Sequence, residues 1–164
     1  MGGCVRDWLL GLNPKDLDVE IYGLPPKKIE EILRKKFHVE MVGKSFGVWI
    51  LKGYHIDVSI PRRERKTGEG HKAFDVECDP MMSTKEACSR RDFTINAILC
   101  DWLTGEIIDP FDGRKDMRLK ILRHTSERFR EDPLRVLRAM QFAARFEMSV
   151  ASETVELCKT IEPE

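Results

Sequence analysis

The sequence has no net charge, no cysteine spacing typical of a metal site and no long apolar run. Its 28 basic residues balance 28 acidic ones, which excludes the global positive field that many nucleic-acid-binding proteins use. The five cysteines form no Cys-x-x-Cys pair and have no nearby histidine at zinc spacing, so they are typical of reduced core thiols. No membrane-spanning segment or signal peptide is visible. The sequence therefore predicts a soluble, cytoplasmic protein with no membrane contact.

What remains is the composition of a globular domain with a strongly charged surface. A length of 164 residues corresponds to about one domain, and 41% hydrophobic residues are enough for a core. Because the net charge is zero, any polyanion must be held by local groups of basic residues. Such groups occur at Arg62–Lys66, at Arg90-Arg91 and between Arg123 and Arg145.

Within residues 15–23, positions 16–21 alternate between polar and apolar side chains, which predicts a half-buried strand. Asp16 and Asp18 then stand side by side on one face. Two adjacent carboxylates repel each other unless cations bind between them, so the pair suits divalent metal ions. An Asp-x-Asp pair alone is weak support, because the solvated faces of strands often carry one.

A second strand is predicted at residues 55–60, where Ile56, Val58 and Ile60 alternate with polar residues. If this strand lies beside the first one, Asp57 shares the face of Asp16 and Asp18. His55 has no identifiable partner and is predicted to be a surface residue.

The chain begins with Gly2-Gly3, which leads into a short predicted helix that ends at Gly11. Val5, Trp8 and Leu9 are expected on its buried side. Paired glycines at a helix start allow backbone N–H groups to approach a phosphate closely. The alternative is a flexible start with no ligand.

The middle of the chain is predicted to alternate between short elements. Residues 61–72 contain three arginines and no apolar anchor, which predicts a loop that is either disordered or ordered by a polyanion. The other expected elements are a helix at 26–36, strands at 37–42 and 46–51 around a turn at 43–45, a short helix with a capping box from Ser83, an apolar helix containing Phe93 to Ile98, a hairpin at 102–106, a turn at 109–113 and a strand at 119–123.

A well-specified helix begins at Asp132-Pro133, which suit the N-cap and the first helical position. A second helix follows from Ser152. The helical period predicts a buried arc that contains Val136, Met140, Ala143 and Ala144. It places Arg135, Arg138, Phe142 and Arg145 on a different arc. An arginine-rich face suits contacts with bases and phosphates, and the alternative is an exposed helix with ordinary ion pairs.

Five motifs in one order resemble the catalytic head of class II tRNA nucleotidyltransferases, the CCA-adding enzymes and bacterial poly(A) polymerases of the polymerase-β superfamily. The motifs are Gly2-Gly3-Cys4-Val5-Arg6-Asp7, Asp16-Leu17-Asp18, Arg90-Arg91-Asp92-Phe93-Thr94-Ile95-Asn96-Ala97, Asp109-Pro110-Phe111-Asp112-Gly113 and Glu131-Asp132-Pro133-Leu134-Arg135-Val136-Leu137-Arg138. The resemblance implies an α+β fold with a small mixed β-sheet flanked by helices. Residues 1–125 would form the head, and 126–164 the start of a helical neck.

The resemblance also implies roles for single residues. Asp16 and Asp18 match the pair that holds two Mg²⁺ ions, and Asp57 resembles the third catalytic carboxylate by its strand placement. The implied nucleotide-binding residues are Gly2, Gly3 and Arg6 at the phosphates, Arg91 and Asp92 with Asn96 of the same motif at the ribose, and Asp132, Arg135 and Arg138 at the base.

The implied activity is template-independent addition of C and A from CTP and ATP to the 3′ end of tRNA, with no protein partner. Residues 42–48 look like the CCA-adding branch, and residues 65–71 resemble the loop that the family links to the final A addition. Gln141 departs from the arginine that is usual in the family. A poly(A) polymerase remains an alternative, and a non-catalytic nucleotide- or RNA-binding module is the alternative from another class.

Overall fold

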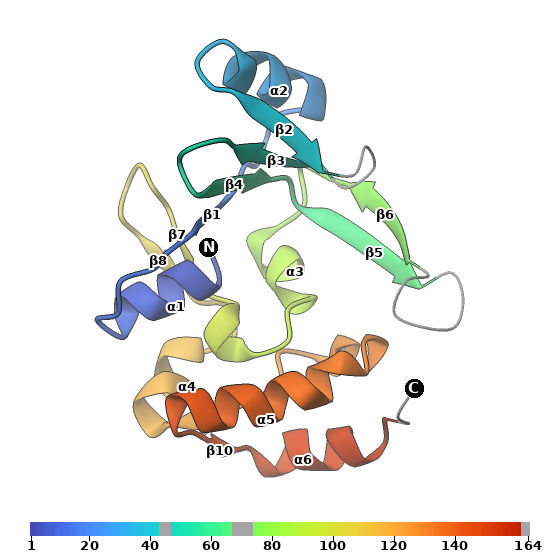
Figure 1. Cartoon of the computed structure of the whole chain (residues 1–164). Helices are drawn as coiled ribbons and strands as arrows, with labels where there is room; N and C mark the ends of the chain where they lie inside the picture. The colour runs from blue at the N-terminus through green and yellow to red at the C-terminus, as the bar shows by residue number, and fades with distance from the viewer. Residues whose placement is uncertain (43–46, 67–73, 162–164) are drawn as a thin grey trace.

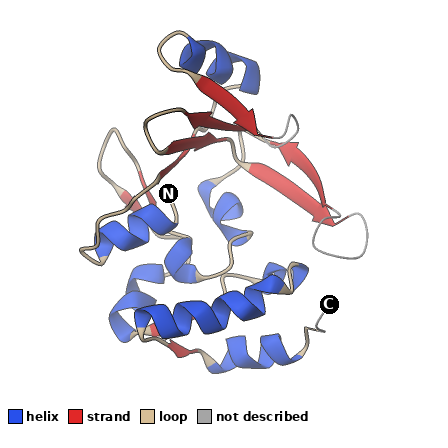
Figure 2. Ribbon diagram, in the orientation of Figure 1, coloured by secondary structure: helices blue, strands red, loops and turns tan. Residues whose placement is uncertain are grey.

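The computed structural model describes residues 1–42, 47–66 and 74–161 of the chain. Its main sheet has four strands in the order β1 (Leu17–Glu20), β4 (Ile56–Ser59), β3 (Val48–Leu51) and β2 (Val39–Val42). β1 pairs with β4 in parallel, whereas the other two pairings are antiparallel. The fold is therefore the predicted α+β arrangement with a small mixed sheet and helices around it (Figures 1 and 2). The predicted turn at 43–45 lies outside the described residues.

The helix α2 (Pro26–Arg34) packs on the main sheet through a small apolar core. Ile29 is 1% exposed and lies in one cluster with Trp49 and Val58 of the sheet. Ile32, which was expected on the same apolar stripe, is exposed instead. Ion pairs Lys28–Glu31 and Arg34–Glu30 lie within α2, and Lys35 at its C-cap pairs with Glu31.

The predicted loop at 61–72 is wrong for its first part, because β5 (Arg62–Lys66) pairs with β6 (Phe74–Cys78) as an antiparallel hairpin. Backbone hydrogen bonds make this ladder, so it needs none of the apolar alternation that signals a half-buried strand. Arg63 forms ion pairs with Asp79 and Glu86 at the base of the hairpin. Residues 67–73, which include most of the predicted flexible loop, lie outside the described part of the chain.

The helix α3 (Thr84–Ser89) begins as predicted, because the Ser83 hydroxyl accepts a hydrogen bond from the Glu86 amide at 3.2 Å. The helix expected at Phe93 to Ile98 is wrong. That segment contains only the 3₁₀ turn η1 (Thr94–Asn96) and is buried on all sides, so its apolar residues do not mark one helical face. The predicted hairpin follows as β7 (Leu99–Cys100) and β8 (Ile107–Ile108).

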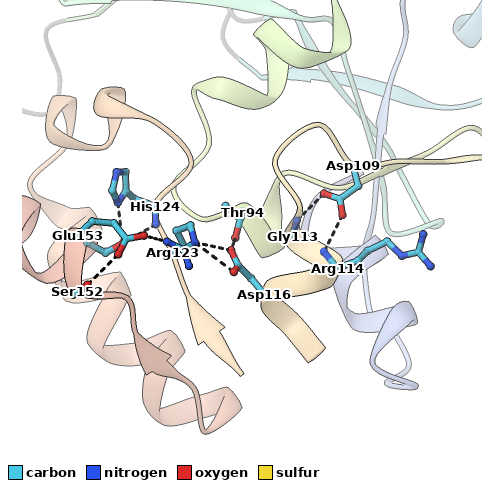
Figure 3. A network of polar contacts seen from close by, with 10 residues as sticks. Thr94, Asp109, Gly113, Arg114, Asp116, Arg123, His124, Ser152 and Glu153 are labelled. Carbon is cyan, nitrogen blue, oxygen red and sulfur yellow. Dashed lines mark hydrogen bonds and ion pairs between the residues drawn. The ribbon is translucent and has the colours of Figure 1, made fainter. Parts of the chain in front are cut away.

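The sequence analysis missed the helix α4 (Gly113–Leu119), which begins at the predicted turn 109–113. The Asp109 carboxylate accepts hydrogen bonds from the amides of Gly113 at 2.8 Å and Arg114 at 2.9 Å, as Figure 3 shows. On the inner side of α4, the buried Asp116 accepts bonds from Thr94 and Arg123. The turn therefore serves as the N-terminal cap of a helix.

A mostly helical layer completes the molecule below the main sheet (Figure 1). It contains η2 (Glu127–Glu131), α5 (Leu134–Phe146) and α6 (Ser152–Lys159), and a short parallel pair joins β9 (Ile121–Leu122) to β10 (Ser149–Val150). Its largest apolar cluster includes Phe93, Phe129 and Phe142. Among the described residues, no helix is both long and apolar enough to cross a membrane.

The predicted buried arc of α5 is confirmed for Ala143, which packs against the core, and is wrong for Met140, which is 65% exposed, and for Ala144, which is also exposed. Ala139 and Phe142 are the buried residues of this helix. Phe142 decides the orientation of the helix, because its ring packs 5.5 Å from the ring of Phe93. On the expected arginine arc, Phe142 is therefore buried, whereas Arg138 and Arg145 beside it are exposed.

Candidate active site

The strand pairing places three carboxylates on one face of the main sheet. Asp18 of β1 stands directly beside Asp57 of β4, as the alternation predicted, and Asp16 lies just before β1. The neighbouring register pair, Val19 and Val58, points to the opposite face, where Val58 is buried against the core under α2. The apolar side of β1 and β4 thus fixes which way the carboxylates point.

Glu20 shares this face but is already used inside the protein. Its carboxylate accepts hydrogen bonds from the Tyr22 hydroxyl at 2.6 Å and from Arg90 at 3.4 Å. Burial and the Glu20 charge both raise the pKa of Tyr22, which therefore stays a neutral donor. Asp16 and Asp18 are left as the open carboxylates at this end of the face.

The Asp18 carboxylate is in an environment that disfavours its charge. Burial is the largest cause that raises the pKa of Asp18, although its side chain keeps contact with solvent. The amino terminus and Arg91 lower this pKa, whereas the charges of Asp57 and Asp16 raise it further. A bound cation would relieve the repulsion between the carboxylates.

His55 has a partner that the sequence did not indicate. Its Nδ1 lies 3.4 Å from Oδ1 of Asp16, and both side chains are exposed. The prediction of a surface position is confirmed, but the expected lack of a partner is wrong. The register of the two strands explains this contact. Leu17 pairs with Ile56, so the residues just before them, Asp16 and His55, come close together.

The donor set fits magnesium held partly by substrate. Within the described ranges, no group of three or more His, Cys, Asp and Glu side chains converges on one metal position. Mg²⁺ usually binds through one or two carboxylates and completes its shell with waters and substrate phosphates. Asp16 and Asp18 supply such a pair of hard oxygen ligands, so these residues fit a metal that substrate oxygens help to hold.

The helix α1 (Gly3–Leu9) has Gly2 as its N-cap, where a side chain would be strained by the positive φ and would require Arg91 to move. Gly2 has a φ of 65°, and a Cβ at this position would lie 2.4 Å from Nη1 of Arg91. The Gly2 amide donates to the carbonyl of Ile98 at 2.9 Å, which ties the start of the helix to β7. Val5 is buried as predicted, whereas Trp8 is 56% exposed, contrary to expectation.

Arg6 is buried, and its guanidinium is bound by other protein groups. It donates to Asp7 Oδ1 from Nε at 2.8 Å and from Nη2 at 2.6 Å, and its Nη1 donates to Oδ1 of Asn96. It also lies over the rings of Phe142 and Phe146 of α5. Asp7 is a member of this site that the sequence analysis did not single out, and its place beside Arg6 in the first motif was the available signal.

Asp92 joins the third motif to α5. Its Oδ1 accepts from Nδ2 of Asn96 at 2.9 Å, and its Oδ2 accepts from Arg138 Nε at 2.8 Å. A polar chain therefore runs from Asp7 through Arg6, Asn96 and Asp92 to Arg138. It brings together four of the predicted nucleotide-binding residues, namely Arg6, Asn96, Asp92 and Arg138.

Asp132 and Arg135 lie at the beginning of α5. Asp132 Oδ1 accepts a hydrogen bond from the Leu134 amide at 3.0 Å. The N-cap is Pro133 and the first helical residue is Leu134, so the predicted N-cap at Asp132 and the predicted first helical position at Pro133 are each one residue too early. Arg135 donates to the backbone carbonyls of Arg128 at 2.8 Å and Arg90 at 2.7 Å. These contacts use two of its five N–H donors, which leaves the others for a ligand.

An open cavity of about 610 Å³ lies against the carboxylates. Gly3, Asp16 and Asp18 line it, and Lys15 and Arg145 supply positive charge to its wall. The structure does not place Asp57, Asp132 or Arg135 in its lining. The predicted site residues therefore lie mainly in three places, which are the cavity lining, the polar chain beside it and the start of α5.

Comparison with known proteins agrees with this arrangement. Residues 1–123 match the family described as the Poly A polymerase head domain. The chain is 44% identical over 160 residues to the multifunctional CCA protein of Methylobacillus flagellatus, covering 97% of this chain and 38% of that relative. It is 45% identical over 161 residues to the multifunctional CCA protein of Nitrosomonas europaea, with 98% and 38% covered.

Solved structures show the same fold. A tRNA nucleotidyltransferase complexed with a primer tRNA and an incoming ATP analog has a TM-score of 0.76 and 34% identity, with 98% of this chain and 45% of that chain covered. A CCA-adding enzyme in complex with ATP has a TM-score of 0.77 and 30% identity, with 97% and 36% covered. The chain spans 38% of the length of the curated relatives it matches. By its sequence, its fold and the motifs that line its cavity, the chain belongs to the family of the Poly A polymerase head domain.

Proposed function

We propose that this chain is the catalytic part of a template-independent nucleotidyltransferase that adds C and A from CTP and ATP to the 3′ end of tRNA. The observation that carries the proposal is the open Asp16–Asp18 pair, which lies in a cavity beside Gly3 and next to Asp57 in the sheet. Proteins similar to this chain are named multifunctional CCA proteins, and one similar structure holds a primer tRNA and an ATP analog.

In the proposed reaction, the RNA 3′-oxygen forms a bond with the α-phosphorus of the nucleotide, and pyrophosphate leaves. Two Mg²⁺ ions would supply the neutralisation of the triphosphate and the activation of the 3′-hydroxyl. Asp16 and Asp18 would hold these ions, and Asp57 adds a third negative charge beside Asp18 that favours cation binding.

The remaining roles follow the polar chain. We assign the backbone at Gly2-Gly3 to the phosphates, Arg91, Asp92 and Asn96 to the ribose, and Asp132, Arg135 and Arg138 to the base. The contact between Asp92 and Arg138 supports this order, because it couples the ribose motif to the helix that carries the base motif. Arg6 acts as a positioning residue, since Asp7 and Asn96 bind its guanidinium. In this proposal residues 1–125 form the head, and 126–164 begin the neck.

The test is the incorporation of labelled CTP and ATP into a tRNA that lacks its 3′ CCA, with and without Mg²⁺. The proposal predicts metal-dependent extension by a few nucleotides, with CTP and ATP preferred over UTP and GTP. A long tract of A would indicate a poly(A) polymerase instead. Binding of nucleotide without any extension would favour the non-catalytic module and contradict the proposal.

A further inference from the structure

Two cations of the cavity have no role in the account so far. Lys15 precedes the carboxylate strand, and Arg145 comes from the last turn of α5. Arg145 and Lys15 are exposed, and within the described ranges no ion pair or hydrogen bond engages the side chain of either residue. Both therefore offer an open positive charge next to Asp16 and Asp18.

The arginines that the motifs assign to the nucleotide are already engaged. Arg6 is bound by Asp7 and Asn96, Arg138 forms an ion pair with Asp92, and Arg135 donates to two carbonyls. A guanidinium whose N–H groups are already bound by protein partners neutralises a ligand poorly unless those partners are displaced. The phosphate charge that enters this cavity therefore needs another source of compensation.

Arg145 is held toward the cavity by an aromatic ring. The Phe146 ring lies 5.0 Å from the guanidinium carbon of Arg145 and 4.6 Å from that of Arg6. In Figure 1 the C-terminal end of α5 lies below α1, and Arg6 of α1 stacks on the Phe146 ring of α5. The ring orients Arg145 while leaving its N–H groups open, which suits a guanidinium that waits for a phosphate.

We propose that Lys15 and Arg145 form the phosphate-binding wall of the cavity and bind the triphosphate of the incoming nucleotide. This inference rests on the proposed nucleotidyl transfer. A triphosphate together with Asp16 and Asp18 carries about six negative charges, and Asp57 beside Asp18 adds one more, whereas two Mg²⁺ ions would neutralise about four. Lys15 and Arg145 supply two further positive charges at the cavity, and Arg145 provides a planar fork for phosphate oxygens.

The experiment compares Arg145→Gln with Arg114→Gln as a matched control. Arg114 is also exposed, lies on α4 outside the cavity lining, and within the described residues its side chain makes no hydrogen bond or ion pair. Binding of CTP, inorganic tripolyphosphate and cytidine to the intact chain is measured with Mg²⁺ by calorimetry. Arg145→Gln should weaken the binding of CTP and tripolyphosphate by about tenfold, as expected for a lost charge-assisted hydrogen bond, and leave cytidine unchanged. Arg114→Gln should change none of them.

The outcomes separate this inference from the proposed function. If the wild-type chain binds CTP and Arg145→Gln binds it equally well, the phosphate-binding wall is wrong, while nucleotidyl transfer stands. If the wild-type chain binds neither CTP nor tripolyphosphate, the proposed function itself is contradicted. A short oligoribonucleotide without a triphosphate serves as the other source of phosphate. Weaker binding of that RNA by Arg145→Gln, with CTP binding unchanged, would assign the wall to the RNA backbone and overturn the inference.

Discussion

At the scale of single residues, Arg135 is the side chain whose two possible roles can be separated by experiment. Its guanidinium joins the carbonyls of Arg90 and Arg128, so it fixes the third motif relative to η2. Arg135→Gln removes a charged donor from two carbonyls and should lower the free energy of unfolding by about 2 kcal/mol. Arg130→Gln is the control, because Arg130 makes only an exposed ion pair with Glu127 and should cost less than about 1 kcal/mol.

The same variant tests the proposed base contact. If the remaining donors of Arg135 recognise the base, Arg135→Gln should lose discrimination by roughly 1–3 kcal/mol, and UTP and GTP should compete better with CTP and ATP. Nucleotide competition measured in the transfer assay gives this result directly. Lower stability with an unchanged nucleotide preference would show that Arg135 only holds the backbone.

Residue-level prediction succeeded where a local period decides the geometry. The alternation around Asp16 and Asp18 and around Asp57 was enough to place three carboxylates on one face. The partners of Arg6 were not predictable in the same way, because Asn96 and Phe142 are brought to it by the packing of η1 and α5. The sequence placed Arg145 only on one arc of a helix, and the structure adds that Arg145 lines the cavity beside Asp16 and Asp18.

At the scale of elements, the start of α4 depends on a glycine with no space for a side chain. A Cβ at Gly113 would lie 2.2 Å from the carbonyl oxygen of Thr94. Gly113→Ala should therefore push α4 away from η1 and lower the free energy of unfolding by about 3 kcal/mol. Thermal unfolding followed by circular dichroism measures this loss.

Gly3→Ala in α1 is the matched control for Gly113→Ala in α4. A Cβ at Gly3 would meet only the Arg6 guanidinium, at 3.6 Å, which is an ordinary contact. Alanine within α1 should leave the stability unchanged or raise it by about 0.5–1 kcal/mol. Equal losses in the two variants would contradict the close contact of Gly113 with Thr94.

The contact between β9 and α6 predicts a pH dependence of stability. His124, which follows β9, lies with its Nδ1 2.8 Å from the buried Thr154 hydroxyl. Burial lowers the pKa of His124 below its usual 6.5, while Glu127 opposes this shift and Arg123 adds to it. As the pH falls, His124 therefore takes up a proton in the unfolded chain before it does so in the folded chain. The stability that neutral His124 contributes is complete above pH 6.5 and is lost as the pH falls through the lower pKa of the folded state.

His124→Asn tests this dependence. The wild type should lose stability as the pH falls below the usual His pKa of 6.5, and the variant should lose less over the same range. Denaturant unfolding at a series of pH values measures the difference. Parallel pH profiles for the two proteins would show that His124 does not titrate in this way.

Element prediction failed where the burial of a segment is not one-sided. Residues 93–98 are buried throughout, so their apolar pattern did not distinguish a 3₁₀ turn from a helix. The charged strand β5 offers no apolar alternation at all. The helix α4 was missed because its inner face depends on Asp116, a buried carboxylate whose partners Thr94 and Arg123 come from other elements.

At the scale of the whole molecule, the proposed head and neck share one apolar core. Phe93 and Leu122 lie in the same cluster as Phe129, Phe142 and Leu157. Each large side chain contributes about 1.5–3 kcal/mol when it is fully buried. A chain of residues 1–125 alone should therefore show no cooperative unfolding transition when denaturant is added at 25 °C. Near-ultraviolet circular dichroism would show this result. A cooperative transition close to that of the intact chain would contradict the shared core.

The central claim is that the two aspartates of the cavity act with metal ions in nucleotidyl transfer. The most direct test is the rate of labelled CTP transfer to a tRNA without its 3′ CCA, at saturating Mg²⁺, for the wild type, Asp16→Asn and Asp18→Asn. Loss of one metal ligand should reduce transfer at least about 100-fold in each variant. The unfolding temperature should stay the same or rise, because the carboxylates repel each other without metal. Wild-type transfer by either variant would contradict the account.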